Sequence, residues 1–95
     1  MKLRIGGQEI QCVERKAGGW SADRIGQCNV ARNRIEIGSY LPEDKKMSTL
    51  LHEVLEWING EYDLGLTHQA ISSLEQSLYA FMRQNPKVVT RIAGR

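Results

Sequence analysis

The chain has 95 residues, 41% hydrophobic and 25% charged, and its 13 basic and 11 acidic residues give a formal net charge of +2. This length predicts one domain with a single modest core, and the composition excludes wholesale disorder. Because the two signs are mixed along the chain, without the basic stripe typical of nucleic-acid binding, we expect no nucleic-acid partner.

The first part of the chain alternates short β-type runs with turn residues. Residues 2–5 and 8–15 flank Gly6-Gly7, which supplies the positive φ angles that a tight hairpin turn needs. A loop is predicted over 17–23.

A second pair of strands is predicted at 24–30 and 34–38. The turn between them contains Asn33, which suits the left-handed conformation. Together the two pairs indicate three or four short strands in one small antiparallel sheet.

The period of the hydrophobic residues becomes helical near Leu41. Pro42 suits a first helical turn, and the acidic residues that follow it complement the helix dipole. Apolar residues then recur at helical spacing until Gly60, a natural stop. They are Met47, Leu50, Leu51, Val54, Leu55 and Ile58.

A second helix is predicted after a short connection, with Thr67 as its N-cap and Asn85-Pro86 as its end. Its apolar stripe consists of Ile71, Leu74, Leu78, Phe81 and Met82. A short loop between two amphipathic helices favours an antiparallel pair. We therefore expect one α+β domain over 1–95, with the sheet in 1–40, an antiparallel helical hairpin in 41–85 and a basic tail in 86–95.

The cellular compartment is inferred from the cysteines and from the lack of targeting segments. Cys12 and Cys28 are too few for a disulfide framework and form no C-x-x-C pair. We find no run with the character of a signal peptide or the length of a membrane span. A cytoplasmic protein with reduced thiols and no membrane partner is expected.

The first helix carries His52-Glu53-x-x-Glu56, which differs from the zinc motif H-E-x-x-H in its last residue. His52 and Glu56 lie one turn apart, so both can reach the same ion. On the second helix Glu75 flanks the apolar stripe, where an unpaired carboxylate needs a partner or a metal. His52 and Glu75 each lie about eight residues from the loop, roughly 12 Å along their helices. The spacing therefore predicts a cluster of His52, Glu56 and Glu75, with His68 nearer the loop.

With these residues the chain resembles the gluzincin metallopeptidases. In many of them a glutamate that binds zinc follows the H-E-x-x-H helix after 18 intervening residues, and 18 residues also separate Glu56 from Glu75. The two helices are similar to those of minimal, zincin-like domains from phages and prophages, whereas the N-terminal sheet is similar only in pattern. The resemblance implies a cytoplasmic peptidase, in a phage or prophage setting, that hydrolyses a peptide bond with metal-activated water.

The same resemblance implies roles for single residues. His52 and Glu75 match metal ligands and Glu53 matches the general base. Since Glu56 adds a second carboxylate, manganese or iron(II) competes with zinc as the divalent metal. His68 either replaces Glu56 as a ligand or orients a carboxylate beside the ion.

The strand before the first helix would, by the same analogy, be an edge that binds an extended peptide by β-augmentation. Its residues are Arg34, Ile35, Glu36 and Ile37. The partner is then a peptide or protein substrate. Two alternatives remain open: an inactive scaffold that binds a host or phage protein, and a helix seam of paired His and Glu side chains without metal.

Overall fold

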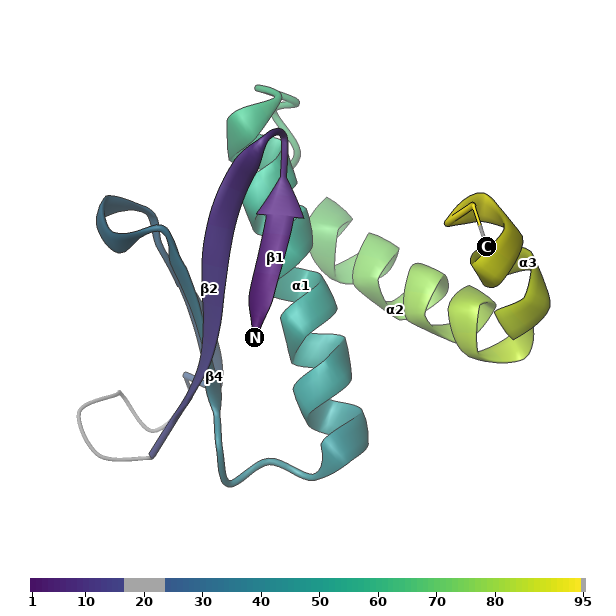
Figure 1. Cartoon of the computed structure of the whole chain (residues 1–95), viewed down its shortest axis with the longest axis horizontal. Coiled ribbons are helices and arrows are strands. Elements are labelled where there is room, and N and C mark those ends of the chain that lie inside the picture. The colour runs from purple at the N-terminus through teal and green to yellow at the C-terminus, as the bar shows by residue number, and fades with distance from the viewer. Residues whose placement is uncertain (17–23, 95) are drawn as a thin grey trace.

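A mixed four-stranded sheet and three α-helices make up residues 1–16 and 24–94, which the computed structural model describes (Figure 1). The helices lie on one face of the sheet, so the α+β prediction is confirmed. The loop predicted at 17–23 lies outside the described residues. No helix in the described ranges is long and apolar enough to cross a membrane.

The first two strands, β1 (Lys2–Ile5) and β2 (Gln8–Arg15), form the predicted hairpin. Gly6 and Gly7 have φ angles of 58° and 85°. Two successive positive φ angles are those of a type I′ turn, whose twist matches that of the strands it joins.

The prediction of an antiparallel sheet is wrong, because the sheet is mixed. The strands β3 (Gly26–Asn29) and β4 (Arg34–Gly38) are antiparallel and are joined by η1 (Val30–Arg32) and by Asn33, which has the predicted left-handed φ of 49°. However, β4 lies between β2 and β3 and runs parallel to β2, in the order β1-β2-β4-β3. Strands that are consecutive in the chain usually pair with each other, but here β4 lies between β2 and β3.

The prediction that residues 34–37 form a peptide-binding edge is also wrong. Both sides of β4 are paired, and Ile35 and Ile37 are buried in the core. Glu36 is buried too and accepts a hydrogen bond from Arg15. Among the described strands, the edges of the sheet belong to β1 and β3.

The core lies between the sheet and α1 (Glu43–Glu61). Its buried members are Ile5, Ile10, Cys12, Ile35, Ile37 and Trp57. The helix begins after Pro42 with two acidic residues in its first turn, as predicted. Thr49, Glu53 and Trp57 are its buried residues, whereas the six predicted apolar positions are only partly buried. The difference arises because α1 contacts both the sheet and the next helix.

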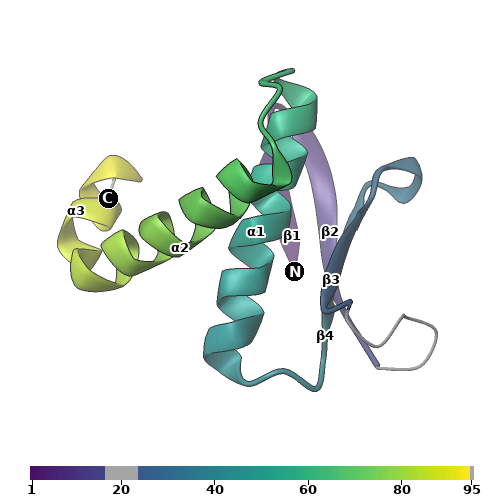
Figure 2. The same ribbon diagram turned by 180° about the vertical axis from the view of Figure 1, so that it is seen from behind.

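The second helix, α2 (His68–Gln84), begins after Thr67, whose hydroxyl accepts a hydrogen bond from the Ala70 amide as an N-cap does. It starts beside α1 and then runs obliquely away from α1 and the sheet (Figures 1 and 2). Of its predicted apolar stripe only Ile71 is fully buried, while Leu78 and Phe81 remain exposed.

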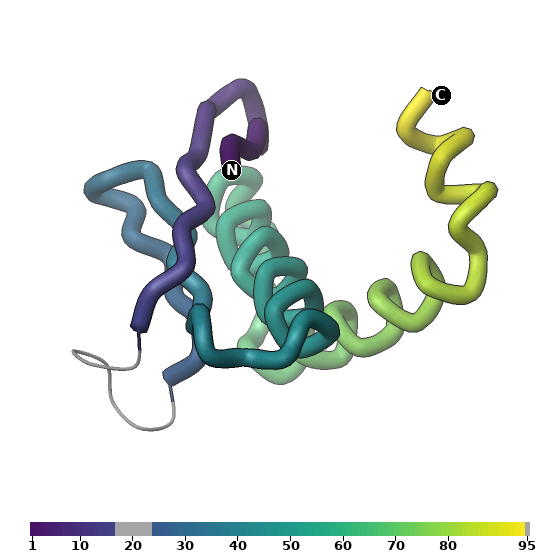
Figure 3. Tube along the Cα trace, turned by 60° about the horizontal axis from the view of Figure 1, so that its bottom comes forward, coloured from purple at the N-terminus to yellow at the C-terminus, as the bar shows by residue number. Residues whose placement is uncertain are grey.

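The last segment was expected to be a tail, but residues 86–92 form a helix, α3 (Pro86–Ile92). Pro86 suits its first turn, where a missing amide proton costs nothing. The helix turns back from the end of α2 and carries the C-terminal end away from the sheet (Figure 3).

Candidate metal centre

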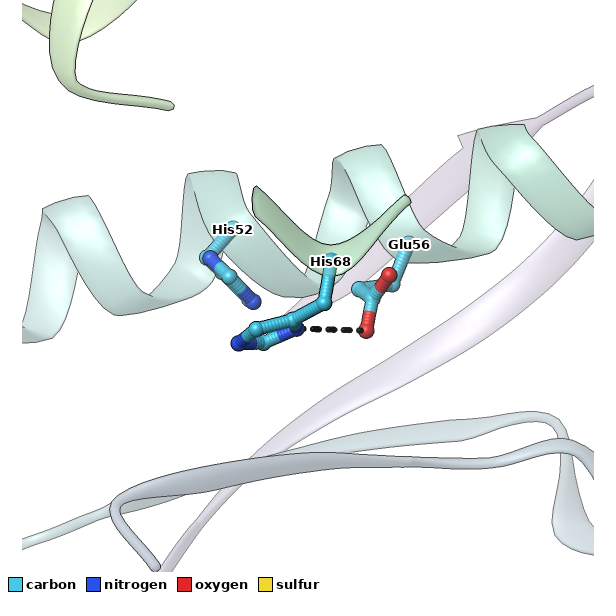
Figure 4. Close-up of side chains that lie close together, drawn as sticks. All are labelled: His52, Glu56 and His68. Carbon is cyan, nitrogen blue, oxygen red and sulfur yellow. Dashed lines mark ion pairs between the residues drawn. The ribbon is translucent and has the colours of Figure 1, made fainter. Parts of the chain in front are cut away.

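Three side chains converge where α2 begins beside α1. His52 and Glu56 extend from successive turns of α1, and His68 extends from the first turn of α2 toward them (Figure 4). Each offers a ligand atom, and these three atoms lie within 4.8 Å of one another. Nδ1 of His68 is 3.8 Å from Oε2 of Glu56, and the two imidazole rings are 5.1 Å apart between centroids. This His-Glu-His group can hold a metal ion.

The donor set suits zinc in particular. Two imidazoles and one carboxylate bind many catalytic zinc ions, with a fourth position left for water. Bonds of about 2.0–2.2 Å would place tetrahedral ligand atoms about 3.4 Å apart, so the three side chains must close by about 1 Å. His68, whose side chain is 76% exposed, is free to make this movement, whereas that of His52 is only 15% exposed and defines the position of the site.

Glu75, predicted as the third ligand, lies behind His52. Its Oε1 is 3.4 Å from Nδ1 of His52, and it is not part of the converging group. A carboxylate on Nδ1 leaves the other ring nitrogen, Nε2, as the ligand atom and orients the ring. The prediction placed Glu75 level with Glu56 because it assumed parallel axes. The inclination of α2 brings His68 level with Glu56, about one turn further from the loop than expected.

Glu53, the predicted base, points from α1 toward the sheet. Its Oε1 accepts a hydrogen bond from the Cys28 thiol on β3 at 3.4 Å. Burial raises the pKa of Glu53, and the hydrogen bond from Cys28 and the charge of His52 offset part of this rise. Burial together with the nearby Glu53 charge also raises the pKa of Cys28, which keeps the thiol protonated as a donor. A carboxylate with a raised pKa is a better proton acceptor near neutral pH.

The lack of a side chain at Gly26 allows α1 to lie close to β3. This role of Gly26 was not predicted from the sequence. A Cβ atom at this position would lie 2.7 Å from Cγ2 of Thr49 and 3.1 Å from Oε2 of Glu53. An isolated glycine in a strand often marks such a close approach, and this was the available signal.

A cavity of about 440 Å³ opens beside the converging side chains. This volume lies within the range of small-molecule and cofactor sites. Its walls come from the start of β3, from α1 and from α2. The residues that line it are Arg24, Ile25, Gly26, Lys45, Ser48, Thr49, His52, Glu53, His68, Ser72 and Glu75. A smaller hollow of about 300 Å³ adjoins it and extends along Gln27 and Cys28 to Glu56.

No protein-family model, curated protein or solved structure matches the chain. The functional inference therefore depends on the site itself. The side chains define a candidate centre for a divalent ion at the border of a largely polar cavity, with a buried carboxylate in the cavity wall.

Proposed function

We propose that the protein is a small metal-dependent peptidase in which His52, Glu56 and His68 bind a divalent ion, with zinc preferred. The observation that carries the proposal is the convergence of two imidazoles and a carboxylate beside a cavity that also contains Glu53. Since His68 supplies the second nitrogen, the set has the donor types of a gluzincin centre, although one ligand comes from a different place in the chain. With two nitrogens, zinc is favoured over manganese and iron(II).

Each neighbouring residue has a role in this proposal. A bound divalent ion would supply Lewis-acid chemistry, polarising a carbonyl group and lowering the pKa of a water molecule. Glu53 would accept the proton of the attacking water and pass it to the leaving amine. Cys28 fixes one oxygen of this carboxylate, and the other lies on the Gly26 side, in the cavity wall. Glu75 orients the imidazole of His52.

The peptide is proposed to bind along β3, not along β4. The strand β3 is an edge of the described sheet and lies against α1 beside Glu53. An edge strand offers unpaired backbone groups to which an extended peptide can add. This keeps the β-augmentation mode and moves it to residues 26–29.

A second candidate function is a scaffold that binds a host or phage protein without chemistry. It is favoured by apolar side chains that α2 and α3 leave exposed, which often mark protein contacts. They are Leu74, Leu78, Phe81, Val88 and Ile92.

Metal analysis of the purified protein tests the proposed centre. We expect one zinc ion per chain, lost in His52→Ala, His68→Ala and Glu56→Ala. Glu75→Gln should weaken zinc binding by about 10–100-fold, as expected for a residue that orients a ligand. The exposed Glu43, on the same helix, provides the matched control Glu43→Ala, which should bind zinc normally.

Three outcomes would contradict the proposal. If zinc, manganese and iron(II) all fail to bind, the peptidase proposal is wrong and the scaffold is favoured. If His68→Ala binds zinc normally and Glu75→Ala does not, Glu75 is the ligand. If Glu53→Gln binds zinc but cleaves peptides as the wild type does, Glu53 is not the base. A seam of ion pairs without metal predicts instead that removing Glu75 lowers stability whether or not zinc is present.

A further inference from the structure

Two cationic side chains line the cavity together with His52. Arg24 lies just before β3 and Lys45 lies near the start of α1. Lys45, Ser48 and His52 follow one another at i, i+3 and i+7, so one face of α1 leads from the ammonium group to the proposed metal. Seven residues of helix correspond to about 10 Å. Because one residue of an extended peptide spans about 3.3 Å, an anion bound at this wall belongs within about three residues of the cleaved bond.

Both cationic side chains are exposed, and no acidic residue of the described ranges holds either of them in an ion pair. Within the described ranges, the Arg24 side chain donates to the neutral side chain of Gln27, at 3.3 Å. In contrast Lys46, the next residue along α1, pairs with Glu14 at 2.8 Å. The cavity therefore offers two positive charges that stand outside any ion pair of the described residues, although the charge of Arg24 also lowers the pKa of Glu53 in the same cavity.

A third group in the cavity wall also lacks a partner. Thr49 is only 4% exposed, and its hydroxyl has no hydrogen-bond partner among the described residues. Buried polar groups are nearly always hydrogen-bonded, but this oxygen exposes less than 1 Å² to solvent, so a ligand in the cavity reaches it only if the wall opens. The acidic groups of the cavity do not supply a partner, since Glu75 contacts His52 and Glu53 contacts Cys28.

We propose that Arg24 and Lys45 bind a carboxylate of the peptide, so that the protein selects acidic peptides. A guanidinium group forms two parallel hydrogen bonds with a carboxylate, and the lysine adds a point charge. This inference rests on the proposed function for the statement that the peptide is a substrate. The binding of the carboxylate itself needs no metal.

Chemical-shift titration of the isotope-labelled protein with short peptides tests the inference. The first probe is an acetylated and amidated hexaalanine with one glutamate, and the second carries glutamine in its place. The third is acetylated hexaalanine with a free C-terminal carboxylate. We expect the glutamate peptide, the free-carboxylate peptide or both to bind at least about fivefold more tightly than the glutamine peptide, with shifts at Ser48 and Ser72. Added salt should reduce the difference.

Charge variants identify the residues responsible. In Arg24→Gln/Lys45→Gln the preference for the carboxylate should fall to about one. The double variant Arg32→Gln/Lys87→Gln removes the same charge from exposed positions outside the cavity and should keep the preference. The Arg24 backbone is held independently of its side chain, because its carbonyl accepts a hydrogen bond from the Tyr40 hydroxyl.

The titrations are made with chelator-treated protein and repeated with zinc, so that failure of the two proposals can be distinguished. A carboxylate preference in the metal-free protein supports the inference even if zinc never binds. Zinc binding without any preference overturns the inference and leaves the metal centre intact. Three results would overturn the inference. In the first, the glutamate and glutamine peptides bind equally and the free carboxylate adds no affinity. In the second, neither acidic peptide causes chemical-shift changes, and in the third, the two double variants lose the preference equally. The source of the preferred carboxylate, side chain or C-terminus, separates internal from C-terminal cleavage.

Discussion

Replacing Gly26 by alanine adds a methyl group where α1 lies closest to β3. The new carbon would lie 2.7 Å from Cγ2 of Thr49, against about 3.5–4.0 Å for an ordinary contact between carbons. The Thr49 side chain has few alternatives, because β-branched residues are stiff at χ1 in a helix. Helix and strand must therefore separate by about 1 Å.

Overpacking of this kind costs about 1–3 kcal/mol. For a domain of this size we expect the melting temperature of Gly26→Ala to fall by about 5–15 °C, as measured by circular dichroism. Gly26 has no left-handed φ, so the loss reflects the contact and not backbone strain. Zinc affinity should change less than threefold, because the proposed ligands lie on α1 and α2, whereas turnover should fall further as Glu53 moves away from β3.

Two variants test whether the contact with Thr49 causes the loss of stability in Gly26→Ala. A Cβ atom added at Gly60, also an α1 residue, would meet no neighbouring atom within 4 Å in the described part of the chain, so Gly60→Ala should be neutral or stabilise by up to about 1 kcal/mol. Thr49→Ser removes the clashing methyl group and should restore at least half of the lost stability in the Gly26→Ala background. An unchanged melting temperature for Gly26→Ala, or no recovery in the double variant, would refute the reasoning.

Two further predictions concern Glu53 and the packing of α2. Burial raises the pKa of the Glu53 carboxyl above its ordinary value of 4.5. The stability that the protonated side chain contributes is therefore complete below that pH and is lost as the pH rises through the folded-state pKa. In metal-free protein Glu53→Gln should therefore raise the melting temperature, relative to wild type, more at pH 7 than at pH 4; a difference independent of pH would contradict this. In urea unfolding, Ile71→Ala should cost about 2–5 kcal/mol and the partly exposed Leu78→Ala less than about 1 kcal/mol. Equal losses would mean that α2 packs along its whole length.

Local rules predicted the local features of the fold. Gly6-Gly7 form the hairpin turn, Asn33 is left-handed, and Thr67 caps α2, because each depends on one or two residues and their own φ angles or hydrogen bonds. The place of β4 depends instead on which strands pair across the sheet. No turn residue encodes that choice, and the preference for sequential neighbours predicted the wrong order.

The candidate site was predictable where it depends on one helix, but not where it depends on how two helices pack. His52 and Glu56 lie on one helix, and their shared stripe follows from helical geometry alone. Whether His68 or Glu75 joins them depends on the inclination of α2, which is determined by side chains at the helix contact and not by the spacing in the chain. Arg24 was also missed, since a single cation in a strand-like run carries no signal until the fold places it in a cavity.

The place of the second imidazole changes what metal binding would do to the fold. In an H-E-x-x-H helix two ligands on one turn hold only that helix, whereas His68 would tie α2 to α1 through the ion. The Asn59 side chain already bonds the amide and the carbonyl of Leu66, so the connection is held on the loop side while the far end of α2 stands away from the sheet. Metal binding that requires α2 to lie in place adds its free energy to the docking of α2. The carboxylate in the motif is thus consistent with a working centre: the donor types are kept, and the ion would stabilise α2, in which Ile71 is the one fully buried residue of the predicted apolar stripe.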